Sequence, residues 1–263
     1  MLEISSSKNP TIKKIKSLYK KKDRWKERQF IIEGIKTVGE AIDSSVSLEH
    51  ILFSNELFDV DGGLEFFESI KDREETVKLP ENLFREISDL ENPQGVMGVV
   101  NFKKGDINKI KDISSPFIIF LDRLNDPGNL GTIIRSADAF GADGIVIGEG
   151  TVDPFNSKVV RATMGSLFRM HIYDVGSNEK FFNEMKNSNV SIITTSLDGE
   201  VLEEEDLSAG IVIAIGNEAN GVGEETLENS NKSVKIPMVG GTESLNAGVA
   251  ASIIMYEAMK GRN

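Results

Sequence analysis

Apolar residues in the second half of the chain gather in short runs that are separated by segments of helical length. The runs span residues 117–121, 144–147, 191–195, 211–215 and 234–236. Strands this uniformly apolar are typical of a parallel sheet that helices cover on both faces. The pattern also predicts a final helix with one apolar face, formed by Leu245, Val249, Ala250, Ile253 and Ile254. We therefore expect an α/β domain in this half of the chain.

The first hundred residues predict a smaller α/β domain. A short strand at 30–33 ends at a glycine turn, a helix follows over 35–42, and a second strand occupies 48–53. The acidic stretch from 56 to 75 is typical of an exposed helix and loop rather than a binding site. A polar segment then separates the two halves, so we expect two domains and a linker between them, at 1–105, 116–263 and 106–115 respectively.

Charge is divided unevenly along the chain. Residues 1–28 hold ten basic side chains against three acidic ones, so this segment carries +7 and the rest carries −19, which gives the formal net charge of −12. The lysines would project from an amphipathic helix, because apolar residues recur at helical spacing at Ile12, Ile15, Leu18 and Tyr19. Such a helix can follow a phosphate backbone or be simply solvated, and the charge pattern is compatible with both.

Composition excludes several classes of protein. The chain has no cysteine and only two histidines, His50 and His171, so disulfides and thiolate metal sites are excluded and no metal is expected. No apolar run approaches the ~18 residues needed to cross a membrane, and charge follows the N-terminus where a secretory peptide needs an apolar core. We therefore expect a cytoplasmic protein with no membrane partner.

Three polar loops each follow a predicted strand and precede a predicted helix. They lie within residues 125–141, 215–223 and 236–250, and each contains glycine and asparagine. The carboxyl ends of parallel strands meet at one edge of a sheet, so these loops predict one assembled pocket. Glycines in the loops permit close approach of backbone groups to a ligand.

Two common nucleotide-binding fingerprints do not fit these glycines. Gly216 opens a run with the first spacing of a P-loop, but Val222 and Gly223 stand where lysine and serine or threonine must reach phosphate and magnesium. Pro154 comes where a dinucleotide-binding turn after Gly148 would continue into its helix. A nucleotide-dependent oxidoreductase or kinase is therefore disfavoured.

In their order and spacing, the three loops resemble the motifs of the SpoU/TrmH branch of the SPOUT RNA methyltransferases. The resemblance covers residues 115–263, and the preceding hundred residues resemble a small α/β RNA-binding domain, related to ribosomal proteins, that many members carry. It implies transfer of a methyl group from S-adenosylmethionine to a ribose 2′-hydroxyl of RNA. It also implies a SPOUT-type parallel sheet with a C-terminal trefoil knot, which base rates for ordinary folds disfavour, and a homodimer formed through the catalytic domain.

The resemblance further assigns a methyl-donor pocket and a set of catalytic residues. The donor pocket would comprise Thr195, Ser196, Gly216, Asn217, Glu218, Ile236, Met238, Leu245 and Asn246. The catalytic residues would be Asn129, Arg135, Glu218, Ser244 and Asn246. A guanidinium with a pKa above ~12 is almost never free to accept a proton. We therefore expect Arg135 to bind the target phosphate and to stabilise developing charge on the 2′-oxygen, while Glu218 or a water accepts the proton.

The basic segment and the resemblance together predict an RNA-binding surface. Its expected members are Lys13, Lys14, Lys20, Lys21, Arg24, Arg28, Arg135 and Arg161. The separate N-terminal domain favours ribosomal RNA as the substrate. Two alternatives stay open, a transfer RNA 2′-O-methyltransferase and a non-catalytic RNA-binding protein on the same fold, and binding of the methyl donor would distinguish the second from an enzyme.

Overall fold

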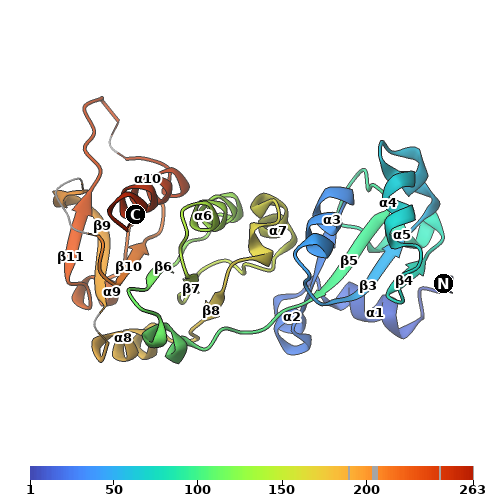
Figure 1. Cartoon of the computed structure of the whole chain (residues 1–263), viewed down its shortest axis with the longest axis horizontal. Coiled ribbons are helices and arrows are strands. Elements are labelled where there is room, and N and C mark those ends of the chain that lie inside the picture. Colours follow the sequence, from blue (N-terminus) through green and yellow to red (C-terminus); the bar gives the residue numbers. More distant parts are fainter. Residues whose placement is uncertain (189, 203–206, 243, 263) are drawn as a thin grey trace. The chain divides into compact units, whose positions relative to one another are not determined.

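A computed structural model describes residues 1–262 except 189, 203–206 and 243. Its helices and strands form two compact units (Figure 1). The first comprises Met1–Lys103 with Phe155–Phe168, and the second comprises Lys104–Pro154 with Arg169–Asn263. The domain limits expected from the sequence, 1–105 and 116–263, stay a prediction. In the described part of the chain, no helix has both the length and the apolar character needed to cross a membrane.

The first unit is built on a five-stranded mixed sheet with the strand order β1-β4-β3-β5-β2. β3 pairs parallel to β4 and antiparallel to β5, and β2 pairs antiparallel to β5. The expected strands at 30–33 and 48–53 and the helix between them are confirmed. The elements of this unit are β1 (Leu2–Glu3), α1 (Pro10–Ser17), α2 (Lys21–Glu27), β2 (Gln29–Glu33), α3 (Ile35–Asp43), β3 (Leu48–Phe53), η1 (Asn55–Asp59), α4 (Gly63–Ile70), β4 (Thr76–Lys78), α5 (Glu81–Ile87), β5 (Val96–Asn101), α7 (Ser157–Thr163) and η3 (Ser166–Phe168).

The basic N-terminal segment folds into α1 and α2. Asn9 starts α1, because its side chain accepts a hydrogen bond of 2.8 Å from the backbone N–H of Thr11. Ile12, Ile15 and Leu18 are buried in the core of the unit, as their spacing predicts. The apolar face of this segment therefore packs inward, and most of its lysines stay at the surface.

The second unit contains a six-stranded sheet of parallel strands with the order β11-β9-β10-β6-β7-β8. This confirms the parallel sheet expected from the apolar runs. The short edge strand β8 was not expected, because it is too short to show a pattern. The elements are η2 (Ile107–Asp112), β6 (Phe117–Leu121), α6 (Pro127–Ala139), β7 (Gly144–Ile147), β8 (Ile172–Asp174), α8 (Asn178–Lys186), β9 (Ser191–Val201), β10 (Ile211–Ile215), α9 (Glu224–Glu228), β11 (Lys232–Lys235) and α10 (Ala247–Arg262).

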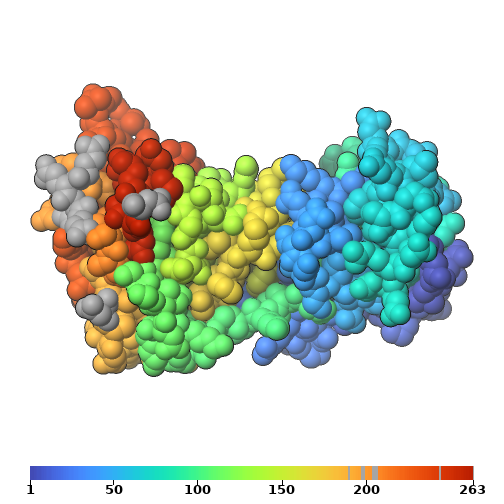
Figure 2. Space-filling view, viewed as in Figure 1, coloured from blue at the N-terminus to red at the C-terminus, as the bar shows by residue number. Residues whose placement is uncertain are grey.

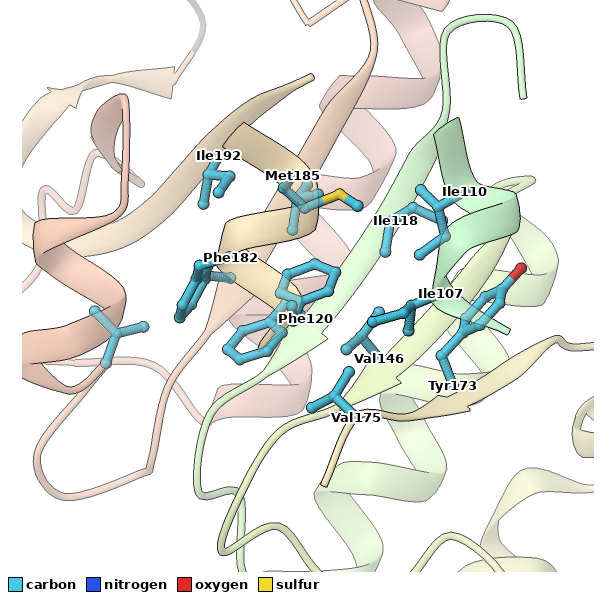
Figure 3. Close-up of a cluster of buried hydrophobic side chains, with 14 residues drawn as sticks. Ile107, Ile110, Ile118, Phe120, Val146, Tyr173, Val175, Phe182, Met185 and Ile192 are labelled. Carbon is cyan, nitrogen blue, oxygen red and sulfur yellow. The ribbon is translucent and has the colours of Figure 1, made fainter. Parts of the chain in front are cut away.

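One face of this parallel sheet is covered by η2 and α8 (Figure 3). Ile107 and Ile110 of η2 belong to the same buried cluster as Phe120 of β6 and Phe181 of α8. The rings of Phe120 and Phe181 stack with their centroids 5.0 Å apart. Aromatic residues of this size contribute much of a core's buried area. The segment expected as a linker at 106–115 therefore supplies side chains to the core of the second unit.

The helix α10 lies beside α6 (Figure 1) and forms part of the molecular surface, where it is red in Figure 2. The hydroxyls of Ser136 and Ser252 share a hydrogen bond of 2.7 Å, and a Cβ atom added to Gly248 would come within 3.1 Å of the Thr132 Cβ. Small residues thus let the two helices approach closely. The buried positions of α10 are Ala247, Gly248, Ala251, Ile254, Met255 and Ala258.

The apolar face expected for the final helix is only partly correct. Ile254 is buried, Ala250 and Ile253 are half-buried, Val249 is 46% exposed, and Leu245 precedes the helix. The physical reason is that small side chains of α10, such as Gly248 and Ser252, form the close contact with α6. Ile254 and Met255 are buried as well, whereas Val249 and Tyr256 are each 46% exposed.

Candidate active site

The first of the three loops follows β6 and begins α6. Asp126 caps this helix, because its Oδ1 accepts a hydrogen bond of 2.7 Å from the backbone N–H of Asn129. Pro127 occupies the first helical position, where its fixed φ is favourable. Asn129 is consequently held in the first turn of the helix, 8% exposed, with its side-chain amide at the carboxyl edge of the sheet.

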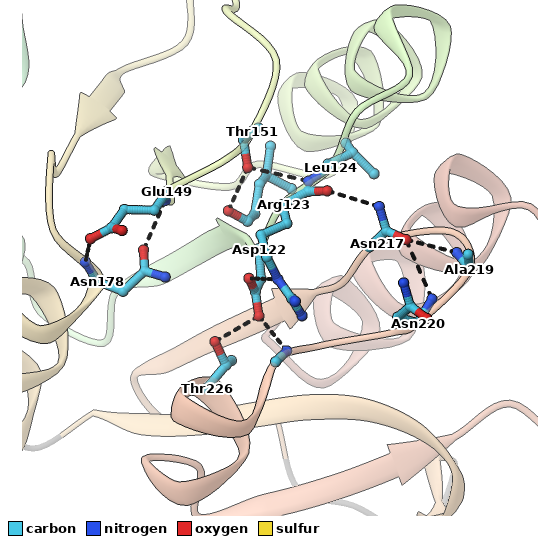
Figure 4. Close-up of polar contacts among 12 residues, drawn as sticks. Asp122, Arg123, Leu124, Glu149, Thr151, Asn178, Asn217, Ala219, Asn220 and Thr226 are labelled. Carbon is cyan, nitrogen blue, oxygen red and sulfur yellow. Dashed lines mark hydrogen bonds and ion pairs between the residues drawn. The ribbon is translucent and has the colours of Figure 1, made fainter.

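The second loop follows β10 and closes on itself (Figure 4). The backbones of Asn217 and Gly221 exchange two hydrogen bonds of 2.9 Å. The Oδ1 atom of Asn217 accepts hydrogen bonds from the backbone N–H groups of Ala219 and Asn220, and its Nδ2 donates to the carbonyl oxygen of Arg123 at 3.0 Å. This tight turn presents Glu218 as an exposed side chain.

The third loop runs from the edge strand β11 back to the start of α10. Asn246 accepts hydrogen bonds at its Oδ1 from the backbone N–H groups of Gly248 and Val249, at 3.0 Å and 3.2 Å. An asparagine in this position satisfies N–H groups that would otherwise lack partners. The same bonds orient the amide, so that its Nδ2 points away from the helix.

Two hydrogen bonds join these three loops. The Nδ2 of Asn246 donates to the Oδ1 of Asn129 at 2.8 Å, and the Nδ2 of Asn129 donates to the Oε1 of Glu218 at 2.9 Å. The chain of donors runs in one direction, from the N-terminus of α10 through two amides to a carboxylate. It confirms that the three loops meet, and it fixes the orientation of each side chain in the series.

Arg135 lies outside this series, in the third turn of α6. Its side chain is exposed and has no hydrogen bond or ion pair with the residues that the structure describes. Asp138, the acidic residue that follows it on the helix, is held by Arg169, whose Nη2 lies 2.6 Å from a carboxylate oxygen. Within the described residues, Arg135 is thus an unpaired cation on α6, six residues after Asn129.

The residues expected in the donor pocket lie within β9, in the loop after β10, and between β11 and α10. Thr195 and Ser196 fall where the pairing of β9 with β11 is irregular, since Thr194 faces Ser233 whereas Glu200 faces Val234. Of the remaining residues, Gly216 is buried. The side chains of Asn217, Ile236, Met238 and Leu245 are half-buried, and those of Glu218, Ser244 and Asn246 are exposed. The half-buried apolar side chains among them could contact a flat aromatic base.

The residues expected to bind RNA fall into three groups. Exposed side chains occur at Lys13, Lys20, Lys21 and Arg28, and Lys14 is half-buried. Arg161 forms an ion pair of 3.6 Å with Asp89 in the same unit. Arg24 is a correction, because it is only 4% exposed and its Nη1 donates a hydrogen bond of 2.8 Å to the carbonyl oxygen of Leu18. Its place in the basic run hid this structural role.

Sequence reasoning missed Asp122, which follows β6 directly. It is 1% exposed, and it accepts hydrogen bonds from the backbone N–H of Gly223 at 2.6 Å and from Oγ1 of Thr226 at 2.8 Å (Figure 4). A charged residue immediately after an apolar run was the only sequence signal. The two partners are about a hundred residues away, so no local pattern could predict them.

The polar groups of the site can bind and orient a ligand and can accept a proton. Within the described residues, no group of three or more histidine, cysteine, aspartate or glutamate side chains is placed to hold a metal ion. Amide, carboxylate and guanidinium groups, with backbone groups at glycine turns, are therefore the chemical means that this edge of the sheet presents.

Family models match both halves of the chain. A model described as the SpoU rRNA Methylase family matches residues 116–256, and one described as the MRM3-like substrate binding domain matches residues 9–98. A similar curated protein is the 23S rRNA (guanosine(2553)-2′-O)-methyltransferase RlmP of Bacillus subtilis (strain 168). It is 34% identical over 261 residues, which cover 97% of this chain and 98% of the relative.

Two solved structures resemble the chain over nearly its whole length. The AdoMet-bound rRNA methyltransferase from Sinorhizobium meliloti has a TM-score of 0.83 and 32% identity, covering 98% of this chain and 97% of the other. The SpoU methyltransferase AviRb from Streptomyces viridochromogenes, in complex with the cofactor AdoMet, has a TM-score of 0.82 and 27% identity, covering 97% and 99%. The similarity thus extends over both compact units.

Proposed function

The chain belongs to the SpoU rRNA methylase family, and we propose that it transfers a methyl group from S-adenosylmethionine to a ribose 2′-hydroxyl of 23S ribosomal RNA. The observation that carries this proposal is the series of hydrogen bonds from Asn246 through Asn129 to Glu218. It gathers groups from three strand ends at one point, as an in-line transfer between two bound molecules requires.

The donor pocket is proposed at the middle of β9 and the loops that follow β10 and β11. Bound S-adenosylmethionine would supply an electrophilic methyl group on a positively charged sulfur. Half-buried Ile236, Met238 and Leu245 offer apolar contacts that suit an adenine ring, and Gly216 allows backbone groups to come close. The chemistry of these residues fits the donor, while Thr195, Ser196 and Asn217 would supply polar contacts around it.

The reaction needs a 2′-hydroxyl that is oriented and that loses its proton. We assign the proton acceptor to Glu218, whose Oε1 is held by Asn129, or to a water bound there. Arg135 would bind the target phosphate and stabilise negative charge developing on the 2′-oxygen. Ser244 and Asn246 would help to orient the nucleotide.

The first unit would hold the RNA through its basic helices. Lys13, Lys20, Lys21 and Arg28 are exposed on or beside α1 and α2, and half-buried Lys14 lies among them. Arg161 remains a secondary candidate, because RNA phosphate would have to displace Asp89 from it. The match to a substrate-binding domain and the name of the relative support ribosomal RNA over transfer RNA.

We also propose that the enzyme is a homodimer through its catalytic domain. Val249 and Tyr256 are each 46% exposed on α10, seven residues apart, and half-buried Ile253 lies between them on the same side of the helix. A second copy would cover this apolar strip. Static light scattering should give the mass of a dimer at micromolar concentration, and Tyr256→Asp should give a monomer. A monomeric wild-type protein would contradict the proposal.

A trefoil knot at the C-terminal end and a ribosomal-protein-like fold of the first unit belong to the same proposal. The path of the chain from the edge strand β11 back to Asn129, followed by packing of α10 on α6, supports a threaded C-terminal segment. The mixed sheet with helices in the first unit supports the second point. A cytoplasmic site of action is also proposed, in keeping with a ribosomal RNA substrate.

The reaction is tested by incubating the protein with labelled S-adenosylmethionine and with unmodified ribosomal RNA or transfer RNA. Alkaline digestion leaves a dinucleotide intact where the 2′-hydroxyl carries a methyl group, so label in resistant dinucleotides from ribosomal RNA is expected. Label in transfer RNA only would overturn the substrate. A protein that binds RNA but not the donor would instead be a non-catalytic RNA-binding protein.

A further inference from the structure

We propose that Asp122 is a positioning residue, which holds the loop between β10 and α9 and thereby places Glu218 and the donor-binding backbone. This inference rests on the proposed function of that loop. Asp122 itself touches neither the donor nor the RNA in this proposal. It acts through the residues that it holds.

The carboxylate of Asp122 binds the C-terminal end of the loop (Figure 4). Its Oδ2 accepts hydrogen bonds from the backbone N–H of Gly223 and from Oγ1 of Thr226, at 2.6 Å and 2.8 Å. Gly223 directly precedes α9 and Thr226 lies in its first turn, so the carboxylate holds the start of that helix. Its Oδ1 accepts a hydrogen bond of 3.0 Å from Nε of Arg123, which leaves both carboxylate oxygens occupied.

The next residue, Arg123, binds the other end of the same loop. Its carbonyl oxygen accepts the hydrogen bond from Nδ2 of Asn217, and its backbone adopts a left-handed φ of 55°, which is uncommon for a residue other than glycine. The hydrogen bond that Nε of Arg123 donates to the Asp122 carboxylate orients the side chain of Arg123. The pair Asp122–Arg123 therefore fixes both ends of the loop, at Asn217 and at Gly223.

Glu218 lies between these two fixed ends. Its side chain is exposed, so packing in a core does not hold it. The loop is also too tight to rearrange freely, because a Cβ atom on Gly216 would lie 2.0 Å from the backbone carbon of Gly221. A shift at Gly223 would consequently be passed along the turn to Glu218 and would break its hydrogen bond with Asn129.

The test compares Asp122→Ala with Asn178→Ala. Asn178 is a matched control, because it is 6% exposed at the same edge of the sheet and its Oδ1 accepts a hydrogen bond of 2.9 Å from the backbone N–H of Glu149, in a loop without donor residues (Figure 4). Calorimetry would measure binding of S-adenosylhomocysteine, and single-turnover assays would measure methyl transfer at saturating donor, both well below the melting temperature.

We expect Asp122→Ala to weaken binding of S-adenosylhomocysteine about tenfold or more and to slow methyl transfer at saturating donor, with RNA affinity unchanged. Asn178→Ala should lower the melting temperature and leave donor binding unchanged. If both variants lower the melting temperature and neither changes donor binding or the transfer rate, Asp122 is merely structural and the inference fails. If the wild-type protein does not bind the donor, the proposed function of the loop fails instead.

A second pair of variants covers the case in which Asp122→Ala does not fold. Thr226→Val removes the hydroxyl that donates a hydrogen bond to Asp122, and Thr226→Ser keeps that hydroxyl. We expect Thr226→Val to weaken donor binding several-fold and Thr226→Ser to restore it. Equal donor binding by both variants would overturn the inference.

Discussion

At the scale of single residues, Arg24 and Arg135 differ in how far their guanidinium groups are exposed. Arg24 is buried, and its guanidinium donates a hydrogen bond to a backbone carbonyl of its own unit. Arg135 is exposed, and the acidic residue near it on α6 is paired with Arg169. The planar fork of donors on Arg135 is therefore available for a phosphate or an oxyanion.

Replacing Arg135 with lysine should slow methyl transfer about 100-fold, because one point charge cannot make the two parallel hydrogen bonds of a guanidinium. Single-turnover transfer to RNA at saturating donor would measure the rate. Binding of S-adenosylhomocysteine should be unchanged, since Arg135 lies outside the proposed donor pocket. Full turnover by Arg135→Lys would exclude a bidentate role.

Asn129 gives a prediction about pH. Asn129→Asp would put a second carboxylate beside that of Glu218, at a position where the amide nitrogen is now 2.9 Å from Oε1. Like charges disfavour the ionised form, so the apparent pKa of the pair rises. If a carboxylate must be ionised there to accept a proton, the acid limb of the pH–rate profile of Asn129→Asp moves to higher pH than that of the wild-type protein.

The control for this pH prediction is Asn129→Ala, which removes the hydrogen bond without adding a charge. We expect it to lower the rate of methyl transfer at every pH and to leave the shape of the pH–rate profile unchanged. Identical profiles for the two variants would show that Glu218 does not titrate in the step that is measured.

At the scale of elements, the pairing of α6 with α10 depends on small side chains. Gly248 faces Thr132 and the hydroxyl of Ser252 meets that of Ser136, so the helices are close along two successive turns. This contact brings the N-terminus of α10, with its capping Asn246, next to Asn129. The geometry of the site is therefore a consequence of how closely these helices pack.

Two glycines of α10 give a matched test of that packing. Alanine is favoured over glycine inside a helix by up to about 1 kcal/mol. Gly261→Ala should raise the free energy of unfolding by at most this amount, because Gly261 lies in the last turn of α10 and the nearest atom to the added methyl would be 3.9 Å away. Gly248→Ala should gain less or lose stability, because its methyl would meet Thr132 at 3.1 Å. Urea unfolding measures both, and equal gains would show that the helices have room to spare.

At the scale of the whole molecule, the distribution of charge along the chain matters more for the proposed RNA binding than the net charge does. The chain carries −12 overall, yet its first 28 residues carry +7. An acidic protein can bind RNA when its cations are concentrated on one segment and remain exposed there, as they do on α1 and α2. The remaining negative charge would repel RNA from other surfaces and so favour one orientation.

Salt dependence of RNA binding tests this division of charge. Replacing one of the exposed residues Lys13, Lys20 or Lys21 with alanine should weaken binding and reduce the slope of log K against log salt concentration by about 1 for each phosphate contact that is lost. Lys71→Ala is the control, because it removes the same charge from the acidic part of the same unit. Equal slopes for all these variants would exclude α1 and α2 from the RNA interface.

Much of the fold follows from local patterns that the amino-acid sequence carries. Strands β6, β7 and β10 begin and end at the limits of their apolar runs, because burial on both faces requires apolar side chains along the whole strand. The start of α1 follows from local capping. The three glycine and asparagine loops, and the family that their spacing indicates, are likewise evident in the sequence itself.

The tertiary structure decided which side chains meet. Asn129, Glu218 and Asn246 are far apart in the sequence, and their hydrogen bonds exist because parallel strands bring their carboxyl ends to one edge and because α10 packs on α6. The buried face of α10 and the partners of Asp122 were decided in the same way. Each depends on atoms that long-range packing supplies, and a periodic pattern along one segment carries no information about them.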